Sequence, residues 1–173
     1  MATDLVEINP DDPQQEALER AAAAVRRGKV VAIPTDALYT LVADPFNLRA
    51  VSRVFLAKGR EPHRALPILI RDTMMAEELA SELNNRFYIL ARRFWPGPLT
   101  IIVPAAAKIP LKVAGNTGRL ALRHALSPVA DKLIARIRWW ERYCERNDAE
   151  MDNNPSAGNK AGGLTTILEK SLG

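Results

Sequence analysis

The sequence is poor in the residues from which the commonest reactive and metal centres are built. Its 173 residues include one cysteine, Cys144, and two histidines, His63 and His124. One cysteine cannot form a disulfide within the chain, and no CxxC or HxxxH spacing indicates a transition-metal site, so we expect no dedicated metal ligands. Because structural disulfides belong to oxidising compartments, this cysteine usage is typical of a cytoplasmic protein.

Signals for export, membrane insertion and the common nucleotide-binding loops are also missing. The N-terminus is polar and acidic, with Thr3, Asp4 and Glu7, and is unlike a signal peptide. No apolar run is long enough to cross a bilayer, so we expect no membrane contact. No Walker-type glycine–lysine loop and no dinucleotide glycine fingerprint occurs, so a bound nucleotide would have to be held by other residues.

Composition and charge are those of an ordinary folded domain. Hydrophobic residues make up 47% and charged residues 25%, which is enough apolar material for one core. The formal charge is +4, from 24 basic and 20 acidic residues. This basic balance suits an anionic ligand such as a nucleotide or RNA, but it also suits many proteins that bind neither.

Helical and extended patterns alternate along most of the chain. Helices are expected over residues 10–28, 47–60, 73–93 with a break near 84–85, and from 127 onward, and strands over 29–33, 66–70, 99–103 and 119–123. Asp12 and Asn47 are the expected caps of the first two helices. The alternation predicts an α/β layer architecture. Residues 145–163 are polar and rich in asparagine and glycine, which predicts a loop or disorder.

The first predicted strand, a continuously apolar and therefore buried run, ends in Pro34-Thr35-Asp36. Ligands in open α/β sheets gather beyond the carboxyl ends of strands, so the hydroxyl of Thr35 is a candidate ligand contact. The alternative is a turn in which Thr35 and Asp36 satisfy their own backbone. The pattern by itself leaves both interpretations open.

Three cations follow the second predicted helix. Lys58, Arg60 and Arg64 lie between a helix end and an apolar run, where they could converge on one phosphate or carboxylate. The alternative is that Lys58 and Arg60 only complement the carboxyl end of the helix.

Five short motifs resemble those of the YrdC-like family, in the family's order and over about residues 12–135. They are Pro34-Thr35-Asp36-Ala37-Leu38-Tyr39-Thr40-Leu41 for PTDT-x-YGL, Lys58-Gly59-Arg60 for K-x-R, Ala65-Leu66-Pro67-Ile68-Leu69-Ile70 for an apolar PL strand, Trp95-Pro96-Gly97-Pro98-Leu99-Thr100 for W-PGP-x-T, and Leu120-Ala121-Leu122-Arg123 for a strand that ends in arginine. One such motif is weak, but five in register are specific.

The resemblance implies a fold and a reaction. The fold would be a twisted, mixed α/β sheet with flanking helices around a concave basic groove. The reaction would condense L-threonine, bicarbonate and ATP into threonylcarbamoyl-adenylate and release pyrophosphate. Other proteins would then move the threonylcarbamoyl group to adenosine 37 of tRNAs, so tRNA and tRNA-modification proteins are the further partners that the resemblance suggests.

The resemblance also assigns roles to residues. Lys58 and Arg60 would be the catalytic pair that steadies the ATP phosphates, with Mg²⁺ sharing the charge. The remaining substrate-binding positions would be Thr35, Arg64, Thr100 and Arg123. Because the protein's task would be to align three reactants, no nucleophilic side chain is needed.

Two positions depart from the first family motif. Ala37 stands where the family has threonine, and Thr40 stands where it has glycine. If that glycine served a positive φ or a close backbone approach, a β-branched residue would strain the turn or fill the groove.

Residues 136–173 depart from the family altogether. Its later strand and S-x-N motif do not follow, since Ser156-Ala157-Gly158-Asn159 has one residue too many and no buried strand before it. We therefore divide the chain into an incomplete YrdC-like domain, residues 1–135, and a divergent helix and tail, residues 136–173. The tail resembles the C-terminal part of an insertion-sequence transposase. A gene that was disrupted or fused near residue 136 would encode such a chain. A sheet without its last strands exposes an edge and an apolar face, which Trp139, Trp140 and residues 164–168 could partly cover.

Three functions stay open from the sequence. The first is an active synthase, which the N-terminal motifs favour. The second is a catalytically inactive YrdC-like nucleotide- or RNA-binding module, which the missing S-x-N motif favours through weakened ATP binding. The third is a hydrolase-type use of the scaffold, as in carbamoyl-transfer maturases, and it is disfavoured because their acylphosphatase and zinc-finger parts are absent from the sequence.

Overall fold

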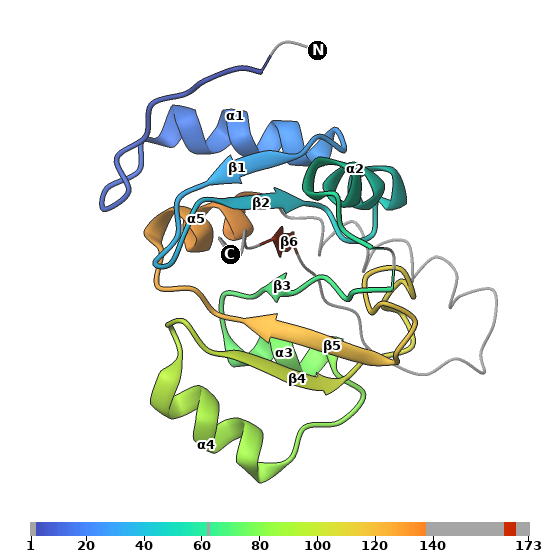
Figure 1. The fold of residues 1–173 in the computed structure, drawn as a ribbon. Coiled ribbons are helices and arrows are strands. Elements are labelled where there is room, and N and C mark those ends of the chain that lie inside the picture. Colours follow the sequence, from blue (N-terminus) through green and yellow to red (C-terminus); the bar gives the residue numbers. More distant parts are fainter. Residues whose placement is uncertain (1–2, 62, 138–164, 169–173) are drawn as a thin grey trace, which may run out of the picture.

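Helices and strands alternate around one sheet, as the sequence predicts (Figure 1). The computed structural model describes residues 3–61, 63–137 and 165–168, the last four by their backbone alone. In chain order the elements are α1 (Gln15–Arg26), β1 (Val31–Ile33), β2 (Thr40–Ala43), α2 (Leu48–Lys58), β3 (Ile68–Leu69), α3 (Thr73–Leu79), α4 (Asn85–Phe94), β4 (Thr100–Pro104), β5 (Arg119–Arg123), α5 (Pro128–Ile137) and β6 (Thr165–Leu168).

The sheet is mixed, which confirms the expected α/β class with flanking helices, while the concave basic groove stays a prediction. Its six strands run in the order β1-β2-β6-β3-β5-β4. Only β3 and β5 pair in parallel among the strands of the described residues, and the other neighbours are antiparallel. A parallel pair needs a crossover connection, and α3, α4 and β4 lie in the connection between β3 and β5.

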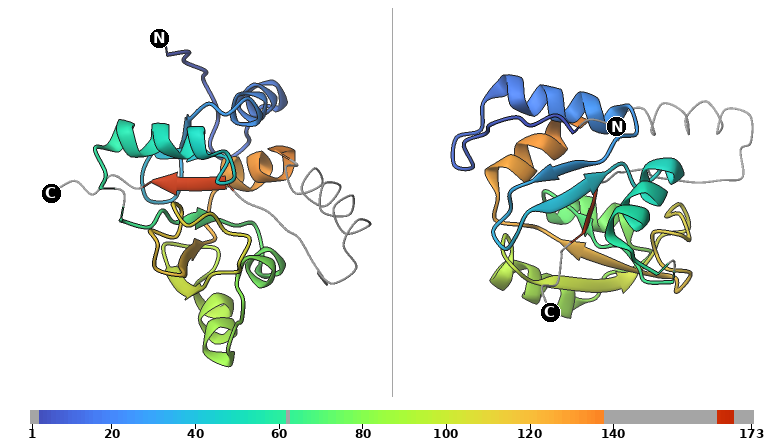
Figure 2. Two further views of the ribbon diagram at one scale, coloured as in Figure 1. Left: turned by 90° about the vertical axis from the view of Figure 1, so that its right-hand side faces the viewer. Right: turned by 45° about the horizontal axis from the view of Figure 1, so that its top comes forward.

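Helices flank the sheet at both of its ends. α1 and α5 lie side by side, and Arg26 Nη1 donates to the carbonyl oxygen of Arg136 at 2.7 Å. Figure 2 shows α1 at one end of the molecule, near β1, and α4 at the opposite end, beyond β4. One apolar cluster runs through the described residues and takes side chains from every one of these helices, among them Leu18, Val51, Leu79, Phe87 and Leu133.

The first two helices show where local signals succeed and fail. Asn47 caps α2 as expected, because its Oδ1 accepts from the backbone N–H groups of Arg49 and Ala50. Asp12 does not cap α1, so that expectation is wrong. The helix starts at Gln15 behind Gln14, which makes no side-chain cap. The reason is a turn just before it, in which Asn9 Oδ1 accepts from the backbone N–H groups at positions 11 and 12.

The first strand is less buried than its apolar run suggests. β1 lies at the edge of the sheet, where Ile33 is buried but Ala32 is exposed. It forms a hairpin with β2, a strand that the sequence pattern did not indicate, with Val31 opposite Val42 and Ile33 opposite Thr40. A short apolar run is therefore compatible with an edge strand as well as a central one.

The sheet position between β2 and β3 is filled by β6, from the end of the chain. Its backbone pairs antiparallel with β2, where Val42 faces Ile167, and with β3, where Ile68 faces Thr166. Residues 164–168 were expected only to cover an open edge, and instead four of them join the two halves of the sheet. The predicted loop at 145–163 and the expected cover by Trp139 and Trp140 lie outside the described residues. Among the helices described, none has the length and apolar character needed to span a membrane.

Candidate functional site

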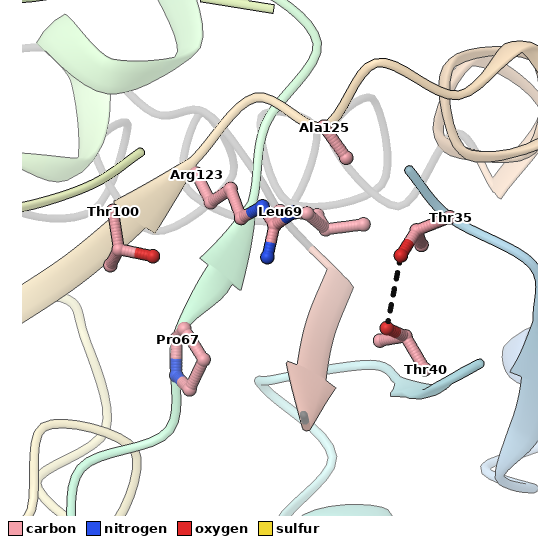
Figure 3. Close-up of a pocket in the computed structure, with 7 residues that line it drawn as sticks. All are labelled: Thr35, Thr40, Pro67, Leu69, Thr100, Arg123 and Ala125. Carbon is pink, nitrogen blue, oxygen red and sulfur yellow. Dashed lines mark hydrogen bonds between the residues drawn. The ribbon is translucent and has the colours of Figure 1, made fainter. Parts of the chain in front are cut away.

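A pocket opens where several strand ends meet, in the middle of the sheet (Figure 3). Thr35 follows β1, Thr40 begins β2, Thr100 begins β4, and Arg123 ends β5. The full set of described lining residues is Thr35, Thr40, Pro67, Leu69, Thr100, Arg123 and Ala125. The site therefore lies beyond the carboxyl ends of the parallel pair β3 and β5, where α/β sheets usually bind ligands.

Thr35 holds the turn of the β1–β2 hairpin and also faces the pocket. Its Oγ1 donates to the carbonyl oxygen of Leu38 at 2.7 Å and lies 3.5 Å from Oγ1 of Thr40. The turn interpretation of Thr35 is therefore confirmed, while its role as a ligand contact stays a prediction that its place in the pocket lining allows.

Thr40 is a feature of the pocket to which sequence reasoning gave no role. It is 1% exposed, and its backbone is that of an ordinary strand residue, since it is not among the positive-φ positions. The β-branched side chain therefore causes no backbone strain here. The side chain instead occupies part of the pocket wall. Of the two consequences expected where the family has glycine, strain in the turn or a filled groove, this position agrees with the second.

Arg123 forms a buried ion pair across the molecule. Its Nη2 donates to Oδ1 of Asp36 at 2.9 Å, and the two side chains are only 7% and 12% exposed. This pair ties the end of β5 to the β1–β2 turn, 87 residues earlier in the chain. Sequence reasoning placed Arg123 at the site but gave Asp36 no role, although its position next to Thr35 was a signal. Breaking such a pair by removing one partner costs about 3–5 kcal/mol.

The start of α5 holds the same turn from a second direction. Ser127 Oγ donates to the carbonyl oxygen of Pro34 at 3.0 Å and accepts from the backbone N–H of Ala130 at 3.2 Å. Ser127 therefore caps α5, at the residue where the sequence predicts that the last helix begins, and also anchors the end of β1.

The tryptophan–proline–glycine turn places Thr100 beside Arg123. Trp95 Nε1 donates to the carbonyl oxygen of Leu99 at 2.7 Å, and the Gly97 N–H donates to the carbonyl of His124 at 2.8 Å. A side chain at Gly97 would meet the carbonyl oxygen of Phe94 at 2.6 Å, so the turn requires glycine. In the pairing of β4 with β5, Thr100 stands directly opposite Arg123.

The remaining predicted residues form a cationic segment, defined as Lys58, Arg60 and Arg64. Lys58 ends α2, and Arg60 Nη2 donates to the carbonyl oxygen of Ala65 at 2.8 Å. Burial, followed by the nearby charge of Arg64, lowers the pKa of Arg60 below its usual value. Arg64 pairs with Glu61 at 3.3 Å, and both side chains are exposed.

The structure brings three of the six predicted site residues into one pocket. Thr35, Thr100 and Arg123 line it, while the cationic segment is not among its described lining residues. The cationic segment is linked to the pocket along the chain. Arg60 contacts the carbonyl of Ala65, and Pro67, two residues later, lines the pocket. The roles expected of Lys58, Arg60 and Arg64 stay predictions.

The pocket presents hydrogen-bonding groups of two kinds. Arg123 supplies donors, and the threonine hydroxyls supply oxygen atoms. Within the described residues, no three histidine, cysteine or acidic side chains gather in a way that could hold a metal ion. Leu69, Pro67 and Ala125 add apolar contacts that would surround the carbon atoms of the ligand.

Comparison with protein families gives two matches. The model of the Sua5/YciO/YrdC family, described as telomere recombination, matches residues 23–140, which include every pocket residue. A second model, the C-terminal part of D-galactarate/altronate dehydratases, matches residues 111–173. The second match includes the whole tail, residues 136–173, and the resemblance of the tail to a transposase stays a prediction.

Two curated relatives are similar over most of the chain. A threonylcarbamoyl-AMP synthase of Pyrococcus abyssi is 40% identical over 136 residues, which are 79% of this chain and 39% of that protein. A threonylcarbamoyl-AMP synthase of Halorhodospira halophila is 34% identical over 118 residues, 68% of this chain and 62% of the relative. The chain thus spans between about two fifths and three fifths of the length of these relatives.

Solved structures share the fold. P. abyssi Sua5 complexed with L-threonine is 36% identical, with a TM-score of 0.70, and the match covers 73% of this chain and 37% of that one. The H234A/Y235A variant of the same protein has a TM-score of 0.74 at 29% identity and covers 92% and 41%. Escherichia coli YciO, at 20% identity, has a TM-score of 0.75, covers 95% and 68%, and supports the fold alone.

Proposed function

The chain belongs to the Sua5/YciO/YrdC family, and from this premise we propose that it is a threonylcarbamoyl-AMP synthase. It would condense L-threonine, bicarbonate and ATP into threonylcarbamoyl-adenylate and release pyrophosphate. The observation that carries the proposal is the 40% identity to a synthase over 79% of the chain. The pocket at the strand ends supports it, because it offers contacts for a small polar substrate inside the matched region.

L-Threonine is the proposed occupant of the pocket. The relative crystallised with L-threonine supports this choice. The guanidinium of Arg123 suits a carboxylate, since charge-assisted N–H donors are among the strongest carboxylate partners. Thr35 and Thr100 would supply polar contacts on the pocket walls. The ion pair with Asp36 would hold the Arg123 guanidinium in place before the substrate arrives.

The cationic segment is the proposed contact for the ATP phosphates. Reaction of the threonine amine with bicarbonate forms a C–N bond and releases water. A carbamate oxygen then attacks the α-phosphorus, whose bond to the bridging oxygen breaks as pyrophosphate leaves. Negative charge spreads over the phosphate oxygens in this step, and Lys58 and Arg60 would stabilise it, with Arg64 as a further contact.

Mg²⁺ is expected to arrive with the nucleotide. Magnesium typically keeps several waters and binds through substrate phosphates and one or two carboxylates, and no dedicated cage of acidic residues is found in the described part of the chain. When bound, the ion would neutralise part of the triphosphate charge. The residues of this chain would then bind the remaining charge and align the two substrates.

The decisive measurement is pyrophosphate release that requires both L-threonine and bicarbonate. We expect Lys58→Ala and Arg60→Ala each to reduce the rate by more than about tenfold, which corresponds to about 1.4 kcal/mol of lost transition-state stabilisation. The control is Arg53→Ala, a cation of α2 whose Nη1 contacts the carbonyl of Gly28 away from the pocket. Unchanged rates in both variants would remove the cationic segment from the site.

An inactive nucleotide- or RNA-binding module is the second candidate. The observation that favours it is the tail, whose match to a different family stands where the S-x-N motif was expected. In this proposal residues 1–135 form the YrdC-like unit, and a fused segment, residues 136–173, supplies β6 to complete the sheet. ATP binding without threonine-dependent pyrophosphate release would establish the module in place of the synthase.

Partners and location follow from the proposed reaction. Threonylcarbamoyl-adenylate would be passed to proteins that modify adenosine 37 of tRNA. A cytoplasmic location fits that role, because tRNA and ATP are both available there. Co-purification of tRNA-modification proteins with the tagged full chain would test this part of the proposal.

A further inference from the structure

Two threonine hydroxyls in the pocket share a single hydrogen-bond acceptor. Thr35 Oγ1 donates to the carbonyl oxygen of Leu38 at 2.7 Å, and Thr40 Oγ1 donates to the same oxygen at 3.3 Å. A hydroxyl has one hydrogen and two lone pairs. Where both hydroxyls donate to this carbonyl, the lone pairs of each oxygen are what it offers to a ligand.

The two hydroxyl oxygens form one acceptor patch. They lie 3.5 Å apart, as the dashed line in Figure 3 shows. Thr35 Oγ1 also lies 3.4 Å from the backbone N–H of Leu38, which takes up one of its lone pairs. Thr40 is 1% exposed and lines the pocket, so its oxygen is reached from the pocket and not from bulk water. A ligand N–H donor would satisfy this oxygen.

The Arg123 side of the pocket has the opposite character. In Figure 3 the guanidinium of Arg123 points into the space between Thr100 and the Thr35–Thr40 pair. A guanidinium has donors and no acceptor. The pocket is thus polarised, with acceptor oxygens on the β1–β2 side and donor nitrogens on the β5 side, and a zwitterion has the matching arrangement of charges.

We propose that Thr40, together with Thr35, receives the amino group of the α-amino acid substrate, while the substrate carboxylate faces Arg123. This inference rests on the proposed function and makes Thr40 a specificity-determining residue. An ammonium group has three donors and no acceptor, so two adjacent oxygens suit it. After the ammonium loses one proton to solvent, the two remaining N–H groups can stay on the two hydroxyls. The nitrogen lone pair is then directed to the bicarbonate carbon, where the C–N bond forms as water leaves.

The test compares two ligands in variants of the full chain. The ligands are L-threonine and 3-hydroxybutanoate, which is threonine without its amino group. Thr40→Val keeps the shape and the strand preference but removes the hydroxyl, and Thr40→Ser keeps the hydroxyl. The matched control is Thr117→Val, because Thr117 Oγ1 also donates to a backbone carbonyl, that of Ala114, but outside the pocket. Titration calorimetry measures each affinity, and thermal unfolding verifies that each variant folds.

We expect Thr40→Val to weaken L-threonine binding by about fivefold to tenfold and to leave 3-hydroxybutanoate binding unchanged. Thr40→Ser and Thr117→Val should bind L-threonine within about twofold of the parent chain. In the pyrophosphate assay, Thr40→Val should raise the KM for L-threonine but not the KM for ATP.

Three results would overturn the inference, and they differ in their meaning. Equal L-threonine affinity in the parent and in Thr40→Val would remove the contact while leaving the synthase proposal intact. Equal weakening of both ligands would show that Thr40 shapes the pocket without receiving the amino group. A parent chain that binds neither ligand and releases no pyrophosphate would overturn the synthase proposal and this inference together.

Discussion

The pocket and the cationic segment are built in opposite ways. The pocket is held by contacts between buried side chains, of which the Arg123–Asp36 pair is 7% and 12% exposed. In the cationic segment, the Arg64–Glu61 pair is 64% and 61% exposed. Buried and hydrogen-bonded contacts fix geometry before a ligand binds, whereas exposed ion pairs contribute little to it. The proposed amino-acid side of the site is therefore preorganised, and the proposed phosphate-binding side would supply charge more than shape.

This difference separates two kinds of mutational effect. Changes to the residues that hold the pocket should lower the free energy of unfolding as well as substrate affinity. Changes to the cationic segment should lower activity and leave the stability nearly unchanged. Arg60 is intermediate, because it is half-buried and contacts the carbonyl of Ala65.

The largest effect is expected from Asp36→Ala. It leaves the buried guanidinium of Arg123 facing a methyl group, and we expect a loss of about 3–5 kcal/mol in the free energy of unfolding, measured by urea denaturation. Asp36→Asn keeps an acceptor oxygen and should cost less, which gives a second variant if the alanine form does not fold. The matched control is Glu61→Ala at the exposed pair, which should cost about 0–1 kcal/mol. Similar losses in Asp36→Ala and Glu61→Ala would contradict the contrast between the two regions.

A smaller effect is expected from Ser127→Ala. The change removes both the cap of α5 and the hydrogen bond to the Pro34 carbonyl, and caps contribute about 0.5–2 kcal/mol. Asn84→Ala is the matched control, because Asn84 caps α4 through the N–H of Phe87 without touching the pocket. Both variants should lose similar stability in urea denaturation, but only Ser127→Ala should weaken L-threonine binding. Equal affinities in the two variants would show that the α5 cap does not position the β1–β2 turn.

The smallest effect is a pH dependence that belongs to neither region. Burial raises the pKa of Glu78 in α3 to about 7, with Asp72 and Glu77 adding to the rise and Lys108 opposing it. Since the folded chain then holds this proton more tightly than the unfolded chain does, stability should fall as pH rises from about 4.5 to about 7. Glu78→Gln should flatten this slope in thermal unfolding at several pH values, without changing L-threonine affinity. An unaltered slope would assign the pH dependence to other groups.

Local signals explain which elements could be predicted. The cap at Asn47, the break before α4 and the bounds of β5 were all indicated by the sequence, because each depends on residues within a few positions. β2 and β6 were missed for the opposite reason. They are four-residue strands whose pairing partners decide their conformation, and short strands carry weak periodicity.

The residues of the candidate site also fall into two groups, those that local signals indicated and those that they did not. The rule that ligands bind beyond strand ends, together with the family motifs, indicated Thr35, Thr100 and Arg123. Nothing local indicated that Asp36 would pair with Arg123. The family motif indicated that Thr40 could fill the groove, but not that it would lie buried beside Thr35 at the pocket wall. Those facts depend on the register of the β1–β2 hairpin and on where β5 lies beside it.

The amino-acid sequence by itself determined the α/β class, most of the helix positions and the motifs that show the family, since these depend on local propensity and on short patterns. Only the tertiary structure decided which oxygens face the pocket, which carboxylate holds Arg123, and that β6 joins the two halves of the sheet. The physical reason is distance along the chain. A contact between residues 87 positions apart is set by the packing of whole elements, and no short stretch of sequence contains it.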